Sequence, residues 1–357
     1  MVDFTWCNEF DFRSEPYERL FGRSAASGFQ HPIWLARVYG QLVPAKGVHP
    51  AILTGYRKSD GRLVYVVPMV KRSFASVSYG EYADLGVMDY CSPVVDDWMA
   101  KALRTDRALR EDLGAAWRQF TIARLQKLHA ENVRQILGLQ SACCTTMAVH
   151  AHSALIKAPF STWRETALTD SFRRFLDRKR RLLGKKAEIE FSVATNEETI
   201  ETAFRALRAF HRQRWTNSLL QQEIYYDFYR DVALEGSRVG AARTYLLTAD
   251  GQPAGVLFGL ASRGRFYLLF MGVNYDVFRN YSVGLLMIES AIEDAIARHE
   301  RVFDLTIGDE PYKDSFGTVS TPMYAAWFGP PAAARVASVA QGARAKIRSA
   351  RTRLVTP

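Results

Sequence analysis

The chain has 357 residues, of which 48% are hydrophobic and 24% are charged, and it carries a formal net charge of +10. This composition excludes an intrinsically disordered chain, and the length predicts two domains of roughly 150–200 residues. No uncharged apolar run approaches the ~18–20 residues that a membrane-spanning helix needs.

The charge surplus favours an anionic partner, and nucleic acid, an anionic lipid surface and a phosphorylated small molecule all suit it. The first residues are acidic where a secretory signal is basic. The four cysteines, Cys7, Cys91, Cys143 and Cys144, lack CxxC spacing, and the adjacent pair suits neither a metal site nor an easy disulfide. We therefore expect free thiols and a cytoplasmic protein.

In the first half of the chain, the clearest local pattern is a β-hairpin. Asp60-Gly61 separates the apolar runs 50–56 and 63–68, and this dipeptide between β-branched runs is a strong hairpin signal. The other segments are predicted to be helical over 29–40, extended or looped over 74–95, helical over 96–129, and strands over 133–139 and 145–150.

The pattern restarts after Pro159. A basic helix is predicted over 170–184, a strand over 188–193, helices over 196–215 and 221–235, and strands over 243–248 and 254–260. The last two flank a second hairpin turn, Asp250-Gly251, so the halves show a weak internal repeat. We expect domains at 1–160 and 161–329 and a basic, Ala- and Arg-rich tail at 330–357.

Residues 265–317 show the pattern of a strand–turn–helix–strand unit that can bind phosphate. An apolar strand over 265–273 precedes Arg279-x-x-Ser282-x-Gly284, a helix over 285–300 and a strand over 302–307. Small residues at the start of a helix let backbone N–H groups approach phosphate oxygens, and the helix dipole adds positive potential. The alternative is an ordinary strand–helix loop in which Ser282 is the N-cap.

Arg279-x-x-Ser282-x-Gly284 resembles the Q/R-x-x-G-x-G/A acyl-CoA signature of the GNAT acetyltransferases, with Ser282 in place of the first glycine. The resemblance implies acetyl-CoA or another acyl-CoA as co-substrate, and we expect no metal. The residues expected to bind the co-substrate are Gly272 and Val273 at the strand end, Arg279, and the backbone amides of Ser282, Val283 and Gly284.

Further stretches resemble the FemAB-related, cellulose-biosynthesis-associated branch of the GNAT proteins. They are Val67-Pro68-Met69-Val70, Asp89-Tyr90-x-x-Pro93, the basic segment 171–181, Phe210-His211-Arg-Gln-Arg214-Trp215, Phe303-Asp304-Leu305 and Gly308-Asp-Glu-Pro-Tyr312-Lys313. This resemblance spans about residues 30–317. It implies an α/β fold of two tandem GNAT-like domains, each with a mixed, mostly antiparallel sheet flanked by helices, with acyl-CoA held by the second.

Acyl transfer needs a base for the nucleophile and an acid for the leaving thiolate. Asp304 and Glu310 are the candidate bases and Tyr312 is the candidate acid. Lys313 is a candidate for stabilising the oxyanion or binding acceptor phosphate. For Asp304 the alternative is a buried structural carboxylate bonded to a backbone amide, and for the loop 308–313 it is a polar turn.

Candidate acceptor-binding residues come from both halves. Arg174 and Arg178 belong to the densest basic run, whose alternative is a solvated helix face. Asp89 and Tyr90 are expected to line the acceptor side from the first domain.

His211 and Arg214 lie near the end of a predicted helix, and we count them as acceptor-binding candidates. A histidine in such a place is more often structural. His150 and His152 share one face of a strand, but no third ligand is close in the sequence, so we expect no metal site.

We therefore expect an acyltransferase that moves an acetyl or other acyl group from acyl-CoA to an amine or hydroxyl. The resemblance implies a saccharide or an envelope- or exopolysaccharide precursor as acceptor, and membrane-associated polysaccharide machinery as a partner. One alternative is a Fem-type transferase that uses aminoacyl-tRNA, which would explain the basic charge. Another is a non-catalytic GNAT scaffold in polysaccharide biosynthesis.

Overall fold

The computed structural model describes residues 1–74, 77–136, 143–157, 159–215 and 217–329. Two compact units divide the chain, one made of residues 1–150 with the segment from Thr321 onward, the other of Ala151–Ser320. The sequence places 151–160 in the first domain and 321–329 in the second, so the units differ from it at both ends. The predicted tail at 330–357 lies outside the described residues.

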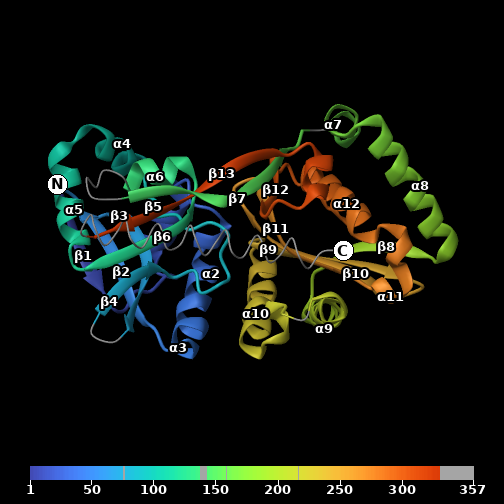
Figure 1. Ribbon diagram of the computed structural model, residues 1–357, viewed down its shortest axis with the longest axis horizontal. Helices are drawn as coiled ribbons and strands as arrows, with labels where there is room; N and C mark the ends of the chain where they lie inside the picture. Colours follow the sequence, from blue (N-terminus) through green and yellow to red (C-terminus); the bar gives the residue numbers. More distant parts are fainter. Residues whose placement is uncertain (75–76, 137–142, 158, 216, 330–357) are drawn as a thin grey trace. The chain divides into compact units, whose positions relative to one another are not determined.

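The N-terminal unit is a mixed sheet with helices (Figure 1), in the strand order β1-β2-β3-β4-β6-β13, with β5 paired to β3. Its strands are β1 Val2–Cys7, β2 His49–Arg57, β3 Leu63–Phe74, β4 Val77–Tyr82, β5 Val94–Val95, β6 Ile122–Leu128 and β13 Val319–Phe328. Its helices are α1 Glu15–Arg23, α2 Pro32–Arg37, α3 Val43–Ala45, α4 Asp97–Thr105, α5 Arg107–Trp117 and α6 Ala130–Ile136, with short turns η1 Gly28–Gln30 and η2 Val38–Leu42.

The Asp60-Gly61 hairpin is confirmed by the β2–β3 pairing, and Gly61 supplies the positive φ (+67°) of the turn. The predicted strand over 145–150 is part of β7. Two other assignments are wrong. Residues 122–128, predicted as helix, form β6, because Ala123 and Leu125 alternate into the core in a period of two. Residues 133–136, predicted as strand, belong to α6, and 137–139 lie outside the described residues.

The C-terminal unit contains the strand order β7-β12-β11-β10-β9-β8. Its strands are residues 151–155 of β7 Cys143–Leu155, then β8 Ile189–Ala194, β9 Ala242–Ala249, β10 Gln252–Ser262, β11 Arg265–Val273 and β12 Val302–Ile307. Its helices are α7 Phe160–Ala167, α8 Asp170–Lys186, α9 Glu197–Arg214, α10 Glu223–Arg238, α11 Tyr275–Phe278 and α12 Val283–Ala297, with short turns η3 Leu219–Gln221, η4 Arg279–Tyr281 and η5 Pro311–Phe316. These confirm the elements predicted from 170 to 307.

Helices cover both faces of this sheet. Helices α9 and α10 lie on one side of β9–β11 and α12 lies on the other (Figure 1). Strand β11 shows why, because its residues alternate: Gly272 faces Leu207 of α9, whereas Met271 and Val273 face Gly284 of α12. The apolar side of α12 packs into the core through residues such as Met287, Ile288 and Ile292.

Among the helices formed by the described residues, none is both long and apolar enough to span a membrane.

Candidate active site

The centre of the C-terminal unit is a pair of parallel strands that separate early. Strands β11 and β12 pair at Arg265–Val302, Phe266–Phe303 and Tyr267–Asp304, yet β11 continues to Val273 and β12 to Ile307. Thr306 has a left-handed backbone (φ +59°), and the register between β12 and β7 shifts between Asp304 and Ile307. The backbone pairing of the two strands therefore ends at Tyr267, and the next carbonyl of β11, that of Leu268, accepts from Oγ1 of Thr306 at 3.1 Å. The edge of β11 beyond Leu268 is one that an extended polar ligand can use.

The chain reaches helix α12 through a turn at Ser282. Ser282 is the N-cap of α12, has left-handed φ and ψ of 55° and 36°, and its side chain makes no capping hydrogen bond. The helix begins at Val283, two residues earlier than predicted. Val283 and Gly284 stand in its first turn, where N–H groups have no acceptor within the helix. This turn is thus suited to bind an anion.

Two glycines let helices approach β11 closely. A Cβ atom on Gly284 would lie 2.9 Å from Cε of Met271, and one on Gly272 would lie 2.9 Å from Cδ1 of Leu207. Real Cβ atoms essentially never come so near, so Gly284 brings the start of α12 against β11 and Gly272 does the same for α9. The predicted cofactor contacts at Gly272, Val273 and 282–284 are therefore neighbours in space.

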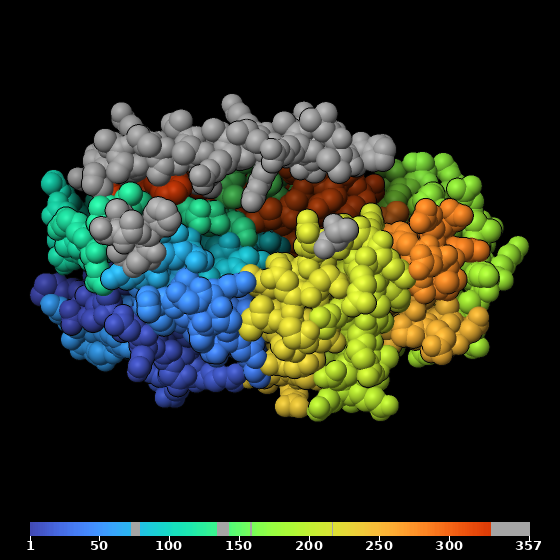
Figure 2. Space-filling model, turned by 60° about the horizontal axis from the view of Figure 1, so that its bottom comes forward, coloured from blue at the N-terminus to red at the C-terminus, as the bar shows by residue number. Residues whose placement is uncertain are grey.

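The basic helix α8 lies beside this turn. Nζ of Lys179 donates to the Asn280 carbonyl at 2.5 Å, and Figure 2 shows the orange surface around residues 275–282 bordering the green surface of α8. Arg180 is used structurally, since it pairs with the buried Glu289 of α12 at 2.7 Å. Arg174 and Arg178, the predicted acceptor-binding residues, are exposed, as is Arg279 next to the turn.

Asp304 fits the structural alternative and not the role of a general base. Its side chain is 1% exposed. Oδ2 accepts from Arg265 at 2.8 Å, and Oδ1 accepts from the backbone N–H of Thr306, also at 2.8 Å. The carboxylate thus fixes the kink that ends the β11–β12 pairing, and a proton-accepting oxygen for a substrate has to come from elsewhere.

The loop after β12 carries the other predicted catalytic residues. Lys313 is 3% exposed, its Nζ lies 3.0 Å from Oε2 of Glu310, and it donates to the Thr306 carbonyl at 3.3 Å. Glu310 is 56% exposed. Lys313 therefore binds the loop to β12 from inside, and Glu310 is the carboxylate that a substrate can reach.

Tyr312, on η5, keeps its proton. Burial and the negative charge of Glu310 raise the pKa of Tyr312 to about 12, although the positive charge of Arg214 acts in the opposite direction. Tyr275 and Tyr312 are both partly buried and pack against the core of this unit. A half-buried phenol that stays protonated at neutral pH is a suitable general acid.

The end of α9 comes to the same place. The Arg214 guanidinium is hydrogen-bonded to the Tyr275 hydroxyl and lies 4.7 Å from the centre of its ring. His211 lies behind it, with Nδ1 2.9 Å from Oγ of Ser218. Burial lowers the pKa of His211 to about 4, and the charge of Arg214 adds to this, so the imidazole is neutral. The sequence analysis does not name Tyr275 as a site residue, because the sequence signal for it, an aromatic residue just after the end of a strand, is weak.

His152 is a second residue whose role the sequence did not reveal. It is buried on β7, its Nε2 lies 3.1 Å from Oδ1 of Asp309, and its Nδ1 lies 3.6 Å from Oδ1 of Asp314. These two aspartates flank the segment that carries Glu310 and Tyr312. Among the residues that the structure describes, no group of three or more His, Cys, Asp or Glu side chains is placed to hold a metal ion.

The N-terminal unit repeats the parallel pair but fills the opening. Strands β4 and β6 also pair at three positions, ending at Glu81–Arg124. Beyond them, Nζ of Lys127 lies 3.0 Å from Asp84 and 2.5 Å from the Met88 carbonyl, and Lys127 in turn accepts the Cys91 N–H at 3.0 Å. These contacts occupy the groups that a ligand would need at this opening.

Asp89 and Tyr90 lie in this N-terminal unit. The Tyr90 ring is buried, 5.6 Å from the ring of Phe29 and 4.5 Å from that of His129, so its role is packing. Asp89 is half-buried and is one of the charges that raise the pKa of Lys127. An acceptor contact at Asp89 stays a prediction.

Comparison with known proteins gives the class. Residues 170–314 match the family model described as an acetyltransferase (GNAT) domain. No curated protein matches the chain. The matched segment is a GNAT-type acetyltransferase domain, and the protein is accordingly an acyltransferase; a GNAT fold implies acyl-CoA as co-substrate. The diverging strands, the uncapped turn at Ser282 and the close approach at Gly284 fit that co-substrate.

Solved structures with the same fold cover almost the whole chain. FemX has a TM-score of 0.59 at 10% identity, over 90% of this chain and 96% of its own. The C-terminal domain of a putative lysylphosphatidylglycerol synthetase from Agrobacterium fabrum has 0.55 at 11%, over 90% and 94%. L-PGS from Bacillus licheniformis has 0.54 at 11%, over 94% and 98%. These likenesses confirm the predicted fold.

Proposed function

We propose that this protein transfers an acyl group, in the simplest case acetyl, from acyl-CoA to an amine or hydroxyl of a saccharide or of an envelope- or exopolysaccharide precursor. The observation that carries the donor half is the early end of the β11–β12 pairing beside the turn at Ser282–Gly284. The acceptor half is supported by the exposed Arg174 and Arg178 of α8, which suit an anionic precursor.

Bound acyl-CoA supplies an acyl group that is already activated as a thioester. The backbone N–H groups of Val283 and Gly284 bind its pyrophosphate, and the exposed guanidinium of Arg279 adds a charge-assisted hydrogen bond from the same turn. The backbone edge of β11 beyond Leu268 orients the chain that leads to the thioester.

The proton transfers fall to two residues of one loop. A carboxylate oxygen of Glu310 takes the proton from the attacking nitrogen or oxygen of the acceptor. The Tyr312 hydroxyl, which stays protonated at neutral pH because its pKa is raised to about 12, gives its proton to the departing sulfur. Lys313 holds Glu310 in place through Oε2, and Arg214 stabilises the Tyr312 phenolate that remains.

Thermal unfolding with and without acetyl-CoA tests the donor half. A ligand that binds only the folded protein stabilises it by about 2.7 kcal/mol at 100 times its Kd, so a clear rise in Tm is expected. Free-thiol release with panels of amino sugars and polysaccharide fragments then tests the acceptor half. If acetyl-CoA leaves Tm unchanged at millimolar concentration, the donor assignment is wrong.

An aminoacyl-tRNA-dependent transferase is the second candidate. The observation that favours it is the common fold with FemX and with the lysylphosphatidylglycerol synthetases, together with the net charge of +10. Tight binding of aminoacyl-tRNA, combined with no response to acetyl-CoA, would establish this alternative. A scaffold without turnover is the third candidate, and any measurable acyl-CoA turnover with an acceptor decides against it.

A further inference from the structure

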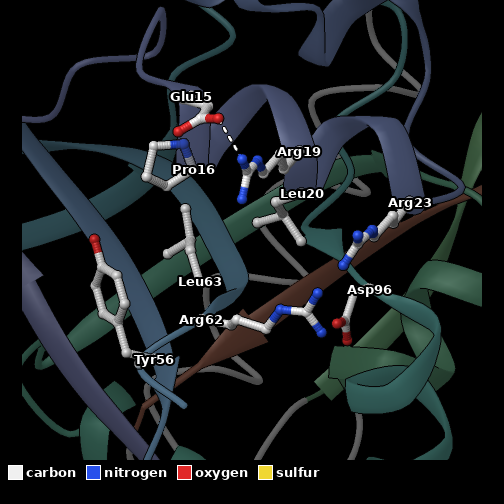
Figure 3. A pocket seen from close by; sticks show the side chains of 10 residues that line it. Glu15, Pro16, Arg19, Leu20, Arg23, Tyr56, Arg62, Leu63 and Asp96 are labelled. Atoms are coloured by element: carbon white, nitrogen blue, oxygen red, sulfur yellow. Dashed lines mark hydrogen bonds and ion pairs between the residues drawn. The ribbon is translucent and has the colours of Figure 1, made fainter.

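A pocket of about 190 Å³ lies in the N-terminal unit, between helix α1 and the β2–β3 hairpin (Figure 3). Its wall is apolar where Leu20 and Leu63 come through from the core, and both of these side chains are buried. The ring of Tyr56 stands at the side of the pocket and is 38% exposed. A flat apolar group therefore finds a surface to pack on.

Three guanidinium groups from two separate elements point into this pocket: Arg19 and Arg23 from α1, and Arg62 from the hairpin (Figure 3). Arg19 is paired with Glu15 one turn earlier in the helix. Arg23 forms no hydrogen bond or ion pair through its side chain within the described part of the chain. Its positive charge is thus available to a ligand.

The carboxylates near Arg62 are already engaged. Asp60 lies 3.7 Å from Nε of Arg62, but it is bound by Arg57, whose Nε donates to Asp60 at 2.9 Å, and Arg62 stays 52% exposed. Asp96 at the pocket edge accepts the Met99 N–H through Oδ1 at 2.7 Å and so caps α4. The pocket is therefore lined by three guanidinium groups and two carboxylates, Glu15 and Asp96. Glu15 is paired with Arg19 and Asp96 caps α4, while Asp60 lies outside the lining.

We propose that this pocket binds a small organic anion, a phosphate monoester or a carboxylate attached to a compact apolar group. Its anionic oxygens lie against Arg23 and Arg62, where guanidinium forks match such groups. Its apolar part packs on Leu20, Leu63 and the Tyr56 ring. The alternative, in which Arg23 merely complements the C-terminal end of the α1 dipole, gives no reason for a second guanidinium and an apolar wall at the same place.

Isothermal titration of the full chain with phenyl phosphate, inorganic phosphate and phenol tests both halves of the site. We expect saturable binding of phenyl phosphate, at least tenfold weaker binding of inorganic phosphate, and no binding of phenol. Arg23→Ala and Arg62→Ala should each weaken phenyl phosphate about tenfold, whereas Arg118→Ala, an exposed arginine of the same unit, should leave it unchanged. Tyr56→Ala should weaken phenyl phosphate and spare inorganic phosphate.

All of these side chains are on the surface, so the variants are expected to keep the Tm of the parent, and that measurement accompanies each titration. Absence of saturable phenyl phosphate binding overturns the proposal, and so does equal affinity in Arg23→Ala, Arg62→Ala and the parent protein. Phenyl phosphate competes with acetyl-CoA only if both use one site. Binding of phenyl phosphate that acetyl-CoA does not displace therefore separates this pocket from the proposed donor site.

Discussion

The Nε2 atom of His152 lies 3.1 Å from Oδ1 of Asp309, although the two residues are 157 positions apart in the chain. The contact ties strand β7 to the start of the loop that carries Glu310 and Tyr312. His152→Ala should therefore speed amide hydrogen exchange over 309–314. With an acceptor in hand it should lower kcat by roughly 10- to 100-fold, since a displacement of about 1 Å can cost that much.

The affinity of this variant for acetyl-CoA should stay within a factor of two, because the turn at Ser282 is not touched by His152. His152→Gln, which retains a donor at the end of the side chain, should restore part of the turnover. A loss of acetyl-CoA affinity as large as the loss of kcat would show that His152 supports the whole unit and not the loop.

Arg279→Ala should weaken acetyl-CoA binding by about tenfold or more, since a hydrogen bond between charged groups is worth roughly 1.5–3 kcal/mol. The guanidinium is exposed and adjoins the turn, so Tm without ligand should not change. Arg298→Ala is the matched control, because Arg298 lies just beyond the other end of α12 and pairs with Asp294. Equal affinity for acetyl-CoA in both variants contradicts the proposed pyrophosphate-binding turn at Ser282–Gly284.

Ser282→Gly should raise the free energy of unfolding by up to about 1 kcal/mol. A left-handed backbone costs an L-residue roughly 1–2 kcal/mol, and the larger unfolded-state entropy of glycine takes back part of the gain. Ser290→Gly, in the interior of the same helix, should have the opposite sign. Urea unfolding of the two variants measures both effects, and destabilisation by Ser282→Gly would mean that the hydroxyl has a role in the folded protein.

His211 should make the protein less stable in mild acid. Burial lowers its pKa from 6.5 to about 4. Between these two pH values His211 is therefore protonated in the unfolded chain and neutral in the folded protein. The stabilisation is complete above pH 6.5 and is lost as the pH falls through 4, by about 3 kcal/mol in total. Denaturant unfolding at several pH values should show a flatter profile for His211→Gln, and an unchanged slope would contradict the assignment.

Local structure could be predicted from the sequence wherever a few neighbouring residues determine the backbone conformation. Asp250 and Gly251 both have positive φ in the structure, as the hairpin turn inferred from this dipeptide requires. The strand–turn–helix order around Ser282 was read correctly for the same reason. The helical prediction for 122–128 was wrong because this segment follows the helices α4 and α5, and seven residues are too few for the alternation of buried and exposed side chains to stand out in the sequence.

Pairings between distant segments were not legible. Asp304 looked like a candidate base because its partner Arg265 lies on another strand, and a sequence does not show that the two side chains meet. His152 was considered only as a metal ligand, since Asp309 and Asp314 come near it only when β7 lies beside β12. The same holds for Lys127, which occupies the space where β4 and β6 separate. Its partners, the Met88 carbonyl and the Cys91 N–H, lie more than 30 residues earlier in the chain.

Strand β13 delays completion of the N-terminal sheet during synthesis, because it is made long after its partner β6. Residues of β6 from Ala123 to Leu128 pair with Tyr324–Phe328, so the first unit to leave the ribosome cannot close its sheet until nearly the whole described chain has been made. At about 5–20 residues per second the wait is roughly 10–40 s, during which the edge of β6 stays open to other partners. During this interval the unfinished chain presents an unpaired sheet edge, which is a site for pairing with other chains.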